Sequence, residues 1–429
     1  MDKDRQTVYR ILKDMEEQGS WSNLALNRGL RDAHVRSEAF VREMVYGVLR
    51  SRMLLDFNID RYLKKPGLKV PDRILLRMGF YQLAFMDHVP DHGAVDQTVE
   101  LASVYAKGRR GFINGVLRSF IRDGKDIRLP RGDGQMGPKD RRRLSVQYSC
   151  SPWIIDLWLA SYGPERLSEL LEASCTPAPL CIRTNILRQS REDLIEKLTA
   201  LGYACRKTEE APHGIYVNGS GLLSTELFRS GCFSVQGEAS QTAAFLLDPR
   251  PGDTVLDLCA APGGKSCAMA ELMEDRGCIK AFDLYEGRTE LIRASARRLD
   301  LHCIEAKAAD AACFDPLRKE TADCVLADVP CSGLGTLRQK PEIKLSDRPE
   351  DMDSLPAIQL SILRNAGAYC RPGGKLLYST CTVDPAENQD VTAAFLKDHP
   401  EFSVLSEKQY FQTKGGCDGF YICLMRKDN

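Results

Sequence analysis

The stretch VLDLCAAPGGKS occupies residues 255–266 and decides the fold prediction. Its apolar first half is typical of a buried strand, and the run Pro262-Gly263-Gly264-Lys265 predicts a tight turn into a helix that begins near Gly264. Small residues let a backbone approach a ligand closely, and a helix N-terminus attracts negative charge. An ordinary strand–helix turn also favours Gly and Ala, but it does not explain so long a run. We therefore expect a ligand-binding turn, named here the glycine turn (residues 259–264).

The sequence on both sides of the glycine turn predicts the fold class. Short apolar strands alternate with helical patterns from about residue 240 onward. The predicted strands read TVLDL, CIKAFD, CIEAKA, CVLADV and GKLLYST. This alternation is typical of a parallel sheet with helices on both faces. The turn matches neither G-x-G-x-x-G nor G-x-x-x-x-G-K-[ST], which disfavours NAD and a P-loop. We expect a Rossmann-like α/β domain over residues 236–429.

Two acidic residues follow predicted strands beyond the glycine turn. Asp283 ends the strand CIKAFD, about twenty residues after the glycines, where a carboxylate accepts hydrogen bonds from ribose hydroxyls. Asp310 follows the next strand and is placed to receive an adenine amino group. A solvated loop carboxylate remains the alternative interpretation for Asp310.

Two cysteines also follow predicted strands. Asp328, Pro330 and Cys331 come after CVLADV, and Cys381 comes after GKLLYST. Ligands of open α/β sheets bind outside the carboxyl ends of the strands, so these residues should converge on one crevice. Burial as small hydrophobic residues explains either cysteine alone, but not both beside a ligand-binding turn.

The first 235 residues predict two further domains. Residues 1–130 carry apolar residues at helical spacing and predict an all-helical domain. Residues 131–149 are rich in Gly, Pro and charge and predict a linker. Residues 150–235 mix helical and strand-like segments and predict a small α+β domain. Residues 1–150 hold 28 Lys and Arg against 19 Asp and Glu, which fits a nucleic-acid partner, although ordinary variation in surface charge explains it equally well.

Composition excludes several classes of protein. The 429 residues include 16 Cys and 6 His, but no C-x-x-C pair occurs, so zinc has little support and we expect no metal. No apolar run reaches the length of about 18 residues that a membrane span requires. The charged N-terminus lacks an apolar signal core. We expect a cytoplasmic protein that acts as a monomer.

These motifs resemble those of a known family, the RNA 5-methylcytosine methyltransferases. LDLCAAPGGKS, DVPCSGLGTLRQKPEIK and YSTCTVDPAENQDV are very similar to its cofactor, Pro-Cys and Thr-Cys motifs. CIRTNIL resembles the Arg-x-Asn signature of its RNA-binding insert, and DGFYICLMRK resembles its final antiparallel strand. The helical front resembles a NusB-type RNA-binding domain. This combination is similar to members that methylate a cytosine of small-subunit (16S) ribosomal RNA; transfer RNA remains an alternative target.

The resemblance implies a role for each candidate residue. Cys381 would add to C6 of the cytosine, Cys331 would assist product release, and Asp328 would hydrogen-bond the base. Lys265 would help to lower the pKa of the Cys381 thiol. S-adenosylmethionine would be the cofactor, and no metal is needed. Its implied contacts are Cys259, Ala260, Ala261, Pro262, Gly263, Gly264, Lys265, Asp283, Arg288, Asp310 and Asp328.

Two rival functions remain at this point. A DNA cytosine-5 methyltransferase would use the cysteine of the Pro-Cys step, Cys331, as nucleophile, but Cys381 and the NusB-like front argue against it. A non-catalytic RNA-binding protein would need only the helical front. The intact glycine turn and both cysteines argue against that function.

Overall fold

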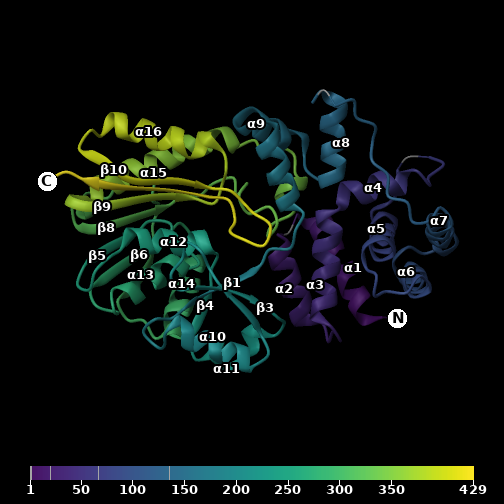
Figure 1. Cartoon of the computed structure of the whole chain (residues 1–429), viewed down its shortest axis with the longest axis horizontal. Coiled ribbons are helices and arrows are strands. Elements are labelled where there is room, and N and C mark those ends of the chain that lie inside the picture. Colours follow the sequence, from purple (N-terminus) through teal and green to yellow (C-terminus); the bar gives the residue numbers. More distant parts are fainter. Residues whose placement is uncertain (1, 20, 66, 135) are drawn as a thin grey trace. The chain divides into compact units, whose positions relative to one another are not determined.

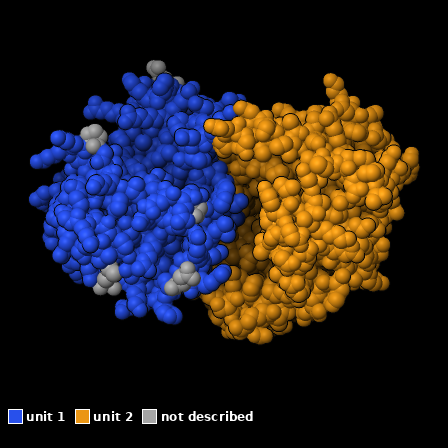
Figure 2. Space-filling model, turned by 180° about the vertical axis from the view of Figure 1, so that it is seen from behind, with its two compact units in different colours: residues 1–176, 337–348 blue, residues 177–336, 349–429 orange. Residues whose placement is uncertain are grey.

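The computed structural model describes residues 2–19, 21–65, 67–134 and 136–429. The chain forms two compact units (Figure 2). The helical unit comprises Met1–Thr176 and Leu337–Arg348, and the α/β unit comprises Pro177–Thr336 and Pro349–Asn429. Within the described ranges, no helix is long and apolar enough to cross a bilayer.

The helical unit confirms the prediction of an all-helical N-terminal domain. Its helices are α1 (Lys3–Gln18), α2 (Ser22–Asp32), α3 (Glu38–Arg50), α4 (Arg52–Asp60), α5 (Val70–Phe85), α6 (Asp91–Tyr105), α7 (Arg110–Arg122), α8 (Pro138–Tyr148) and α9 (Pro152–Ser174). The apolar faces of α1 to α7 enclose one core, which includes Val45, Leu76 and Phe120. Because apolar residues recur at three- and four-residue spacing, the outer helices turn one stripe toward that core, whereas α5 is buried on all sides from Ile74 to Leu83.

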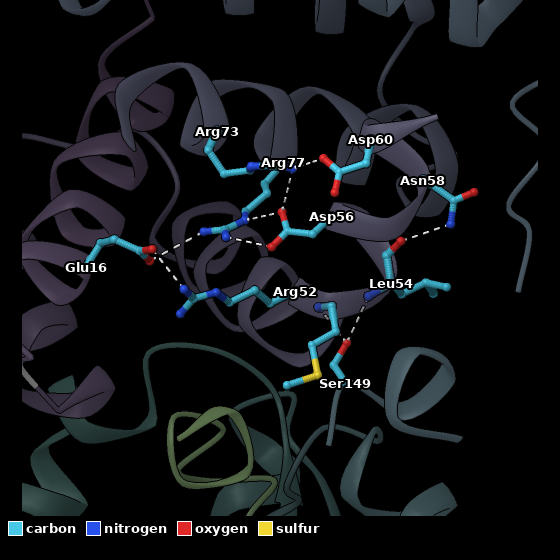
Figure 3. A network of polar contacts seen from close by, with 10 residues as sticks. Glu16, Arg52, Leu54, Asp56, Asn58, Asp60, Arg73, Arg77 and Ser149 are labelled. Carbon is cyan, nitrogen blue, oxygen red and sulfur yellow. Dashed lines mark hydrogen bonds and ion pairs between the residues drawn. The ribbon is translucent and has the colours of Figure 1, made fainter. Parts of the chain in front are cut away.

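A network of ion pairs joins α1, α4 and α5 beside this core (Figure 3). The guanidinium of Arg77 donates to both carboxylate oxygens of Asp56, at 2.8 and 2.7 Å, and contacts Glu16 at 3.4 Å. Arg52 donates to the same Glu16 at 2.8 Å. Since the Arg77 side chain is only 7% exposed, these carboxylates offset the cost of burying its charge, and the two-bond fork links α5 to α4.

The prediction that residues 131–149 form a linker is wrong for most of the segment, because it contains α8. Pro138 at the start of the helix pre-sets the backbone for the first turn. The helix carries three consecutive arginines and few apolar residues, so it gives no helical periodicity in the sequence. Ser149, which follows it, accepts hydrogen bonds from the first backbone amides of α4, those of Met53 and Leu54, at 3.1 and 3.3 Å. The segment is therefore a packed part of the helical unit (Figure 3).

Residues 337–348 also belong to the helical unit, although they follow the Pro-Cys motif in sequence. Lys344 is fully buried there. Its ammonium donates to the carbonyl of Tyr148, at the end of α8, at 2.8 Å, and lies 3.5 Å from the Cys175 sulfur, just after α9. Both partners lie at helix C-termini, where the partial negative charge stabilises a cation. The Ser151 amide in turn donates to the Lys344 carbonyl at 2.7 Å.

The sequence predicts a small α+β domain over residues 150–235, but α9 lies in the helical unit. The α/β unit therefore begins with a smaller α+β domain. Its strands and helices are β1 (Leu180–Thr184), α10 (Arg191–Ala200), β2 (Ala204–Lys207), β3 (Gly214–Asn218), α11 (Glu226–Arg229) and β4 (Phe233–Val235). The strands form an antiparallel sheet in the order β2-β3-β1-β4. We name this part, residues 177–235, the insert. No apolar pattern in the sequence indicates β2 or β4, because β2 is short and polar and β4 has three residues.

The larger sheet confirms the predicted Rossmann-like domain. It contains β5 (Thr254–Asp257), β6 (Cys278–Asp283), β7 (Ile304–Ala308), β8 (Ala322–Asp328), β9 (Cys370–Thr380), β10 (Phe402–Tyr410) and β11 (Phe420–Lys427), in the order β10-β11-β9-β8-β5-β6-β7. The pairs among β5 to β9 are parallel, and β11 is antiparallel to both its neighbours. The sequence does not predict β10, because this edge strand has buried residues only at its two ends.

Helices cover both faces of this sheet (Figure 1). They are α12 (Glu238–Leu247), α13 (Gly264–Leu272), α14 (Glu286–Leu299), α15 (Leu355–Tyr369) and α16 (Gln389–Asp398). Successive strand residues point to opposite faces, so Val255 and Leu377 join the core under α12 to α14. Leu256 and Leu376 join the core under α15 and α16. Burial on both faces explains why these strands read as continuous apolar runs.

Candidate active site

The glycine turn leaves β5 at the point where the strand order reverses. The strands β6 and β8 pair with opposite sides of β5, and ligands of such sheets bind at this switch point. Gly263 has a φ of 99°, and a Cβ placed on it would lie 3.0 Å from Ile292 Cα. The turn therefore requires glycine there, both for the backbone angle and for the close approach of α14.

The glycine turn borders an open pocket of about 550 Å³. Seven of the predicted site residues line it, together with Val235, Gln236, Gly237, Ser240 and Asp257; the seven are Cys259, Ala260, Ala261, Pro262, Gly264, Lys265 and Asp328. The sequence prediction thus placed most of its cofactor residues around one cavity. Gly263 shapes the turn without lining the pocket.

Asp257 is a pocket residue that the sequence analysis missed. One carboxylate oxygen accepts a hydrogen bond from the Ser266 hydroxyl at 2.6 Å, and the other, Oδ1, is buried without a protein partner. Burial raises the pKa of Asp257 to about 7, with a further contribution from the nearby charge of Asp328. A buried acceptor without a donor, at the wall of a pocket, suits a cationic or N–H group of a ligand.

Asp283 and Arg288 both contact the backbone of Ala261 in the glycine turn. The Ala261 amide donates to the buried Asp283 carboxylate at 3.2 Å, and Arg288 donates to the Ala261 carbonyl at 3.3 Å. Arg288 and Asp283 also form an ion pair at 3.5 Å. Asp310 is exposed and accepts a hydrogen bond from the Ala312 amide of its own loop, at 2.9 Å. Asp283 and Arg288 thus hold the turn at Ala261, and neither they nor Asp310 are among the residues that line the pocket.

The two predicted cysteines meet. Cys331 follows β8, Cys381 follows β9, and their sulfur atoms lie 3.3 Å apart without forming a disulfide. Two sulfurs this close do not readily ionise together, so at most one of the pair is a thiolate at a time. The hydrogen bond to Cys381, together with burial, raises the pKa of the Cys331 thiol well above its ordinary value.

A set of polar contacts fixes the loops that carry the cysteines. The carboxylate of Glu387 is buried and accepts hydrogen bonds from the Ser332 amide at 2.9 Å and from the Gln359 amide group at 2.8 Å. The hydroxyls of Ser332 and Thr382 lie 2.8 Å apart and join the two loops directly. Glu387 stands in the quoted motif YSTCTVDPAENQDV, but nothing in its sequence context separates it from a surface carboxylate.

Lys265 and Asp328 are held together at the pocket wall. The Lys265 ammonium lies 2.6 Å from one oxygen of Asp328, and the Ser379 hydroxyl donates to the other oxygen at 2.7 Å. The ammonium also lies 5.1 Å from the centre of the Phe420 ring. The pair brings a cation and an anion to the same edge of the sheet as the cysteines. In the described part of the chain, no three His, Cys, Asp or Glu side chains gather as metal ligands.

Models of known protein families match three parts of the chain. The model for 16S rRNA methyltransferase RsmB/F matches residues 244–422, and the NusB family model matches residues 2–122. A ferredoxin-like domain model of RsmF/B-like methyltransferases matches residues 151–222. These matches confirm the predicted NusB-like front, the small insert and the methyltransferase domain.

Similar proteins match along nearly the whole chain. The probable ribosomal RNA small subunit methyltransferase B of Bacillus subtilis (strain 168) is 35% identical, over 99% of this chain and 98% of that protein. The ribosomal RNA small subunit methyltransferase B of Vibrio cholerae is 31% identical, over 94% of this chain and 93% of that protein.

A solved structure supports the fold. The crystal structure of a methyltransferase homolog from Pyrococcus horikoshii is 27% identical, covers 68% of this chain and all of that chain, and superimposes with a TM-score of 0.60. With the glycine turn, the seven-stranded sheet and the near full-length relatives in agreement, this chain belongs to the RsmB/F family of 16S rRNA methyltransferases.

Proposed function

We propose that the chain methylates C5 of a cytosine in 16S ribosomal RNA, with S-adenosylmethionine as methyl donor and Cys381 as nucleophile. The observation that carries the proposal is the 3.3 Å approach of the Cys331 and Cys381 sulfurs just after β8 and β9, at the same edge of the sheet where Asp328 lines the pocket of the glycine turn. Cytosine C5 is a poor nucleophile, and a thiolate added at C6 turns C4–C5 into an enamine-like system that attacks an activated methyl group. The names of the relatives support small-subunit ribosomal RNA as the target.

The pocket suits S-adenosylmethionine. The glycine turn lets the backbone approach the ligand, and the unpaired Asp257 oxygen suits the ammonium of its amino-acid part. Asp283 lies beside the turn, where it would accept hydrogen bonds from the ribose; Arg288 would support it, and Asp310 would take the adenine amino group. S-adenosylmethionine supplies a methyl group already activated by its sulfonium, so the proposal includes no metal.

Each residue near the cysteines has a role in the proposed reaction. Cys381 forms the bond to C6, and Asp328 hydrogen-bonds the base near N3 while charge develops there. In the release step Cys331, directly or through a water, accepts the C5 proton, the C5–H electron pair forms the C5–C6 double bond, and Cys381 leaves C6 as a thiolate. Cys331, in contact with the Cys381 sulfur, assists this elimination. Lys265 adds positive potential at the same edge of the sheet.

The remaining domains would hold the RNA. We assign RNA binding to the NusB-like domain, residues 1–130, and to the small domain, residues 150–235, with residues 236–429 as the catalytic part. The excess of Lys and Arg in residues 1–150 supports phosphate contacts. The target base must leave its stack to reach Cys381. We propose that a single chain performs the reaction.

Covalent capture of RNA tests the assignment of the cysteines. Purified wild-type, Cys331→Ala and Cys381→Ala proteins are incubated with S-adenosylmethionine and a 16S ribosomal RNA fragment, and the products are separated on a denaturing gel. We expect Cys331→Ala to accumulate an RNA–protein adduct, because release fails, and Cys381→Ala to form none. The reverse pattern would assign the nucleophile to Cys331 and overturn the proposal.

The position and class of the target need a second measurement. Bisulfite sequencing of total RNA from cells with and without the protein should show one protected cytosine in 16S ribosomal RNA. Protection only in transfer RNA would contradict the proposed substrate while leaving the chemistry intact. Isothermal titration with S-adenosylmethionine completes the test, because the absence of binding would remove the proposed cofactor.

A further inference from the structure

A buried arginine of the insert reaches the glycine turn. Arg183 lies in β1 and is 3% exposed. Its guanidinium donates to both oxygens of Glu271 in α13, at 3.1 and 2.7 Å, which makes a two-bond fork. A third nitrogen donates to the Gly264 carbonyl at 2.8 Å and to the side-chain oxygen of Gln236. One side chain therefore joins the sheet of the insert to both ends of the helix that follows the glycine turn.

Besides Glu271, the guanidinium of Arg183 has two further hydrogen-bond partners, and both are pocket residues. Gly264 and Gln236 both line the cavity beside the glycine turn. Gln236 directly follows β4, which pairs with β1, and its backbone amide donates to the Cys181 carbonyl of β1 at 3.1 Å. Val235, the last residue of the insert, and the adjoining Gln236 thus supply part of the pocket wall, and Arg183 fixes Gln236 against the first residue of α13.

Stability alone does not account for this arrangement. Glu271 is 2% exposed, and an ion pair removed from water loses hydration that its mutual attraction barely offsets. Apolar residues of similar volume would fill the same space at no such cost. A planar fork, in contrast, holds its partners at fixed distances and angles. The ion pair is therefore better suited to setting a geometry than to adding stability.

We infer that Arg183 is a positioning residue that couples the insert to the cofactor pocket, so that RNA held by the insert and S-adenosylmethionine bound at the glycine turn strengthen each other's binding. This inference rests on the proposed function. A displacement of β1 moves the Gly264 carbonyl and Gln236 together, and so changes the pocket. Thermodynamic linkage then requires that the cofactor change RNA affinity by the same factor.

The variants Arg183→Lys and Glu271→Gln test the coupling in the full-length protein. Lysine keeps the charge but cannot form the fork, and glutamine keeps the shape but removes the ion pair. Each is titrated with S-adenosylmethionine, with and without a 16S ribosomal RNA fragment. We expect the wild-type affinity for the cofactor to rise when RNA is present. In both variants the cofactor affinity should fall about tenfold or more and the RNA effect should shrink toward none.

Two matched controls separate positioning from general destabilisation. Arg188 also links the insert to the catalytic part, through an exposed ion pair with Asp300 at 3.5 Å, and Arg188→Lys should leave the coupling unchanged. Leu194 is fully buried in the core of the insert, so Leu194→Ala lowers stability without touching the pocket. It should lower the melting temperature while its cofactor affinity and its RNA effect stay near wild type.

The outcomes distinguish this inference from the proposed function. A wild-type protein that binds no S-adenosylmethionine removes the proposed function itself. A wild type that binds it, with Arg183→Lys and Glu271→Gln showing the same cofactor affinity and the same RNA effect, overturns the inference alone. Kinetics give a second reading, because a positioning role raises the KM for S-adenosylmethionine while kcat at saturation stays close to wild type. A fall in kcat alone would also overturn the inference.

Discussion

Asp257 ends β5 with one carboxylate oxygen bonded to Ser266 and the other without a partner. Burial raises the pKa of this carboxyl to about 7, far above the value of about 3.9 in an unfolded chain. The folded protein therefore retains a proton between these values that the unfolded chain releases. The stability from this group is fully present below about pH 4 and is lost as pH rises through 7.

Cofactor binding should show the opposite dependence on pH. An ammonium placed beside Asp257 favours its charged form, so binding releases a proton. We predict that S-adenosylmethionine affinity rises about fivefold between pH 6 and pH 7, as the ionised fraction of a group with a pKa of about 7 rises. Titration calorimetry in buffers of different ionisation enthalpy measures both the affinity and the proton release. In Asp257→Asn the rise should disappear; a rise that persists would assign the titration to another group.

At the level of single residues, the sequence predicts the site residues that stand in strong motifs. It does not predict residues whose importance comes from contacts with distant parts of the chain. The glycine turn and both cysteines were placed correctly at one edge of the sheet. Arg183 stood in a quoted signature, but its partner Glu271 is 88 positions away, and no local pattern indicates such a pair. Glu387 is buried only because two loops close over it. Roles in chemistry stay predictions for all of them.

At the level of elements, a close backbone contact supports the loops that carry the cysteines. A Cβ on Gly335 would lie 2.0 Å from the Gly419 carbonyl oxygen and 2.8 Å from that of Cys381. We predict that Gly335→Ala shifts the Cys381 loop, lowers methylation more than tenfold and destabilises the protein by about 1–3 kcal/mol. The pocket of the glycine turn should keep its affinity for S-adenosylmethionine, which calorimetry measures.

A helical glycine provides the control for that prediction. Gly115 in α7 has no atom within 4 Å of an added Cβ, so Gly115→Ala should leave activity unchanged and should not lower the melting temperature. If Gly335→Ala methylated RNA at the wild-type rate, the loops would not depend on this contact.

The elements that the sequence failed to predict share a physical cause. The edge strand β10 buries only Phe402 and Tyr410 at its ends, so no alternation appears. The helix α8 is rich in charged residues, and its packing is not visible as an apolar stripe. The strands β5 to β9 were predicted because burial on both faces makes them continuously apolar. Apolar periodicity appears only where a helix or strand buries apolar side chains, so elements with little burial cannot be predicted from it.

At the level of the whole molecule, the helical unit is assembled from two parts of the chain. Residues 337–348 contribute Lys344, whose ammonium lies at the ends of α8 and α9. We predict that a fragment of residues 1–176 is less stable, by about 2 kcal/mol or more, than the same fragment with a peptide of residues 337–348 bound. Urea unfolding with and without the peptide measures the difference.

A peptide with Lys344→Ala serves as the control, because it lacks the cation and should stabilise the fragment less. An unfolding midpoint that neither peptide changes would contradict a structural role for the segment.

The same arrangement constrains how such a protein can be recombined. A chimaera that exchanges only residues 1–176 with those of a relative would retain a foreign strip of twelve residues in the new helical unit, since Leu337–Arg348 would come from the other parent. An exchange of the complete helical unit therefore needs three crossover points, after residues 176, 336 and 348, whereas an exchange of one continuous N-terminal segment needs one. A chimaera that is to keep the helical unit intact must take the distant strip from the same parent as residues 1–176.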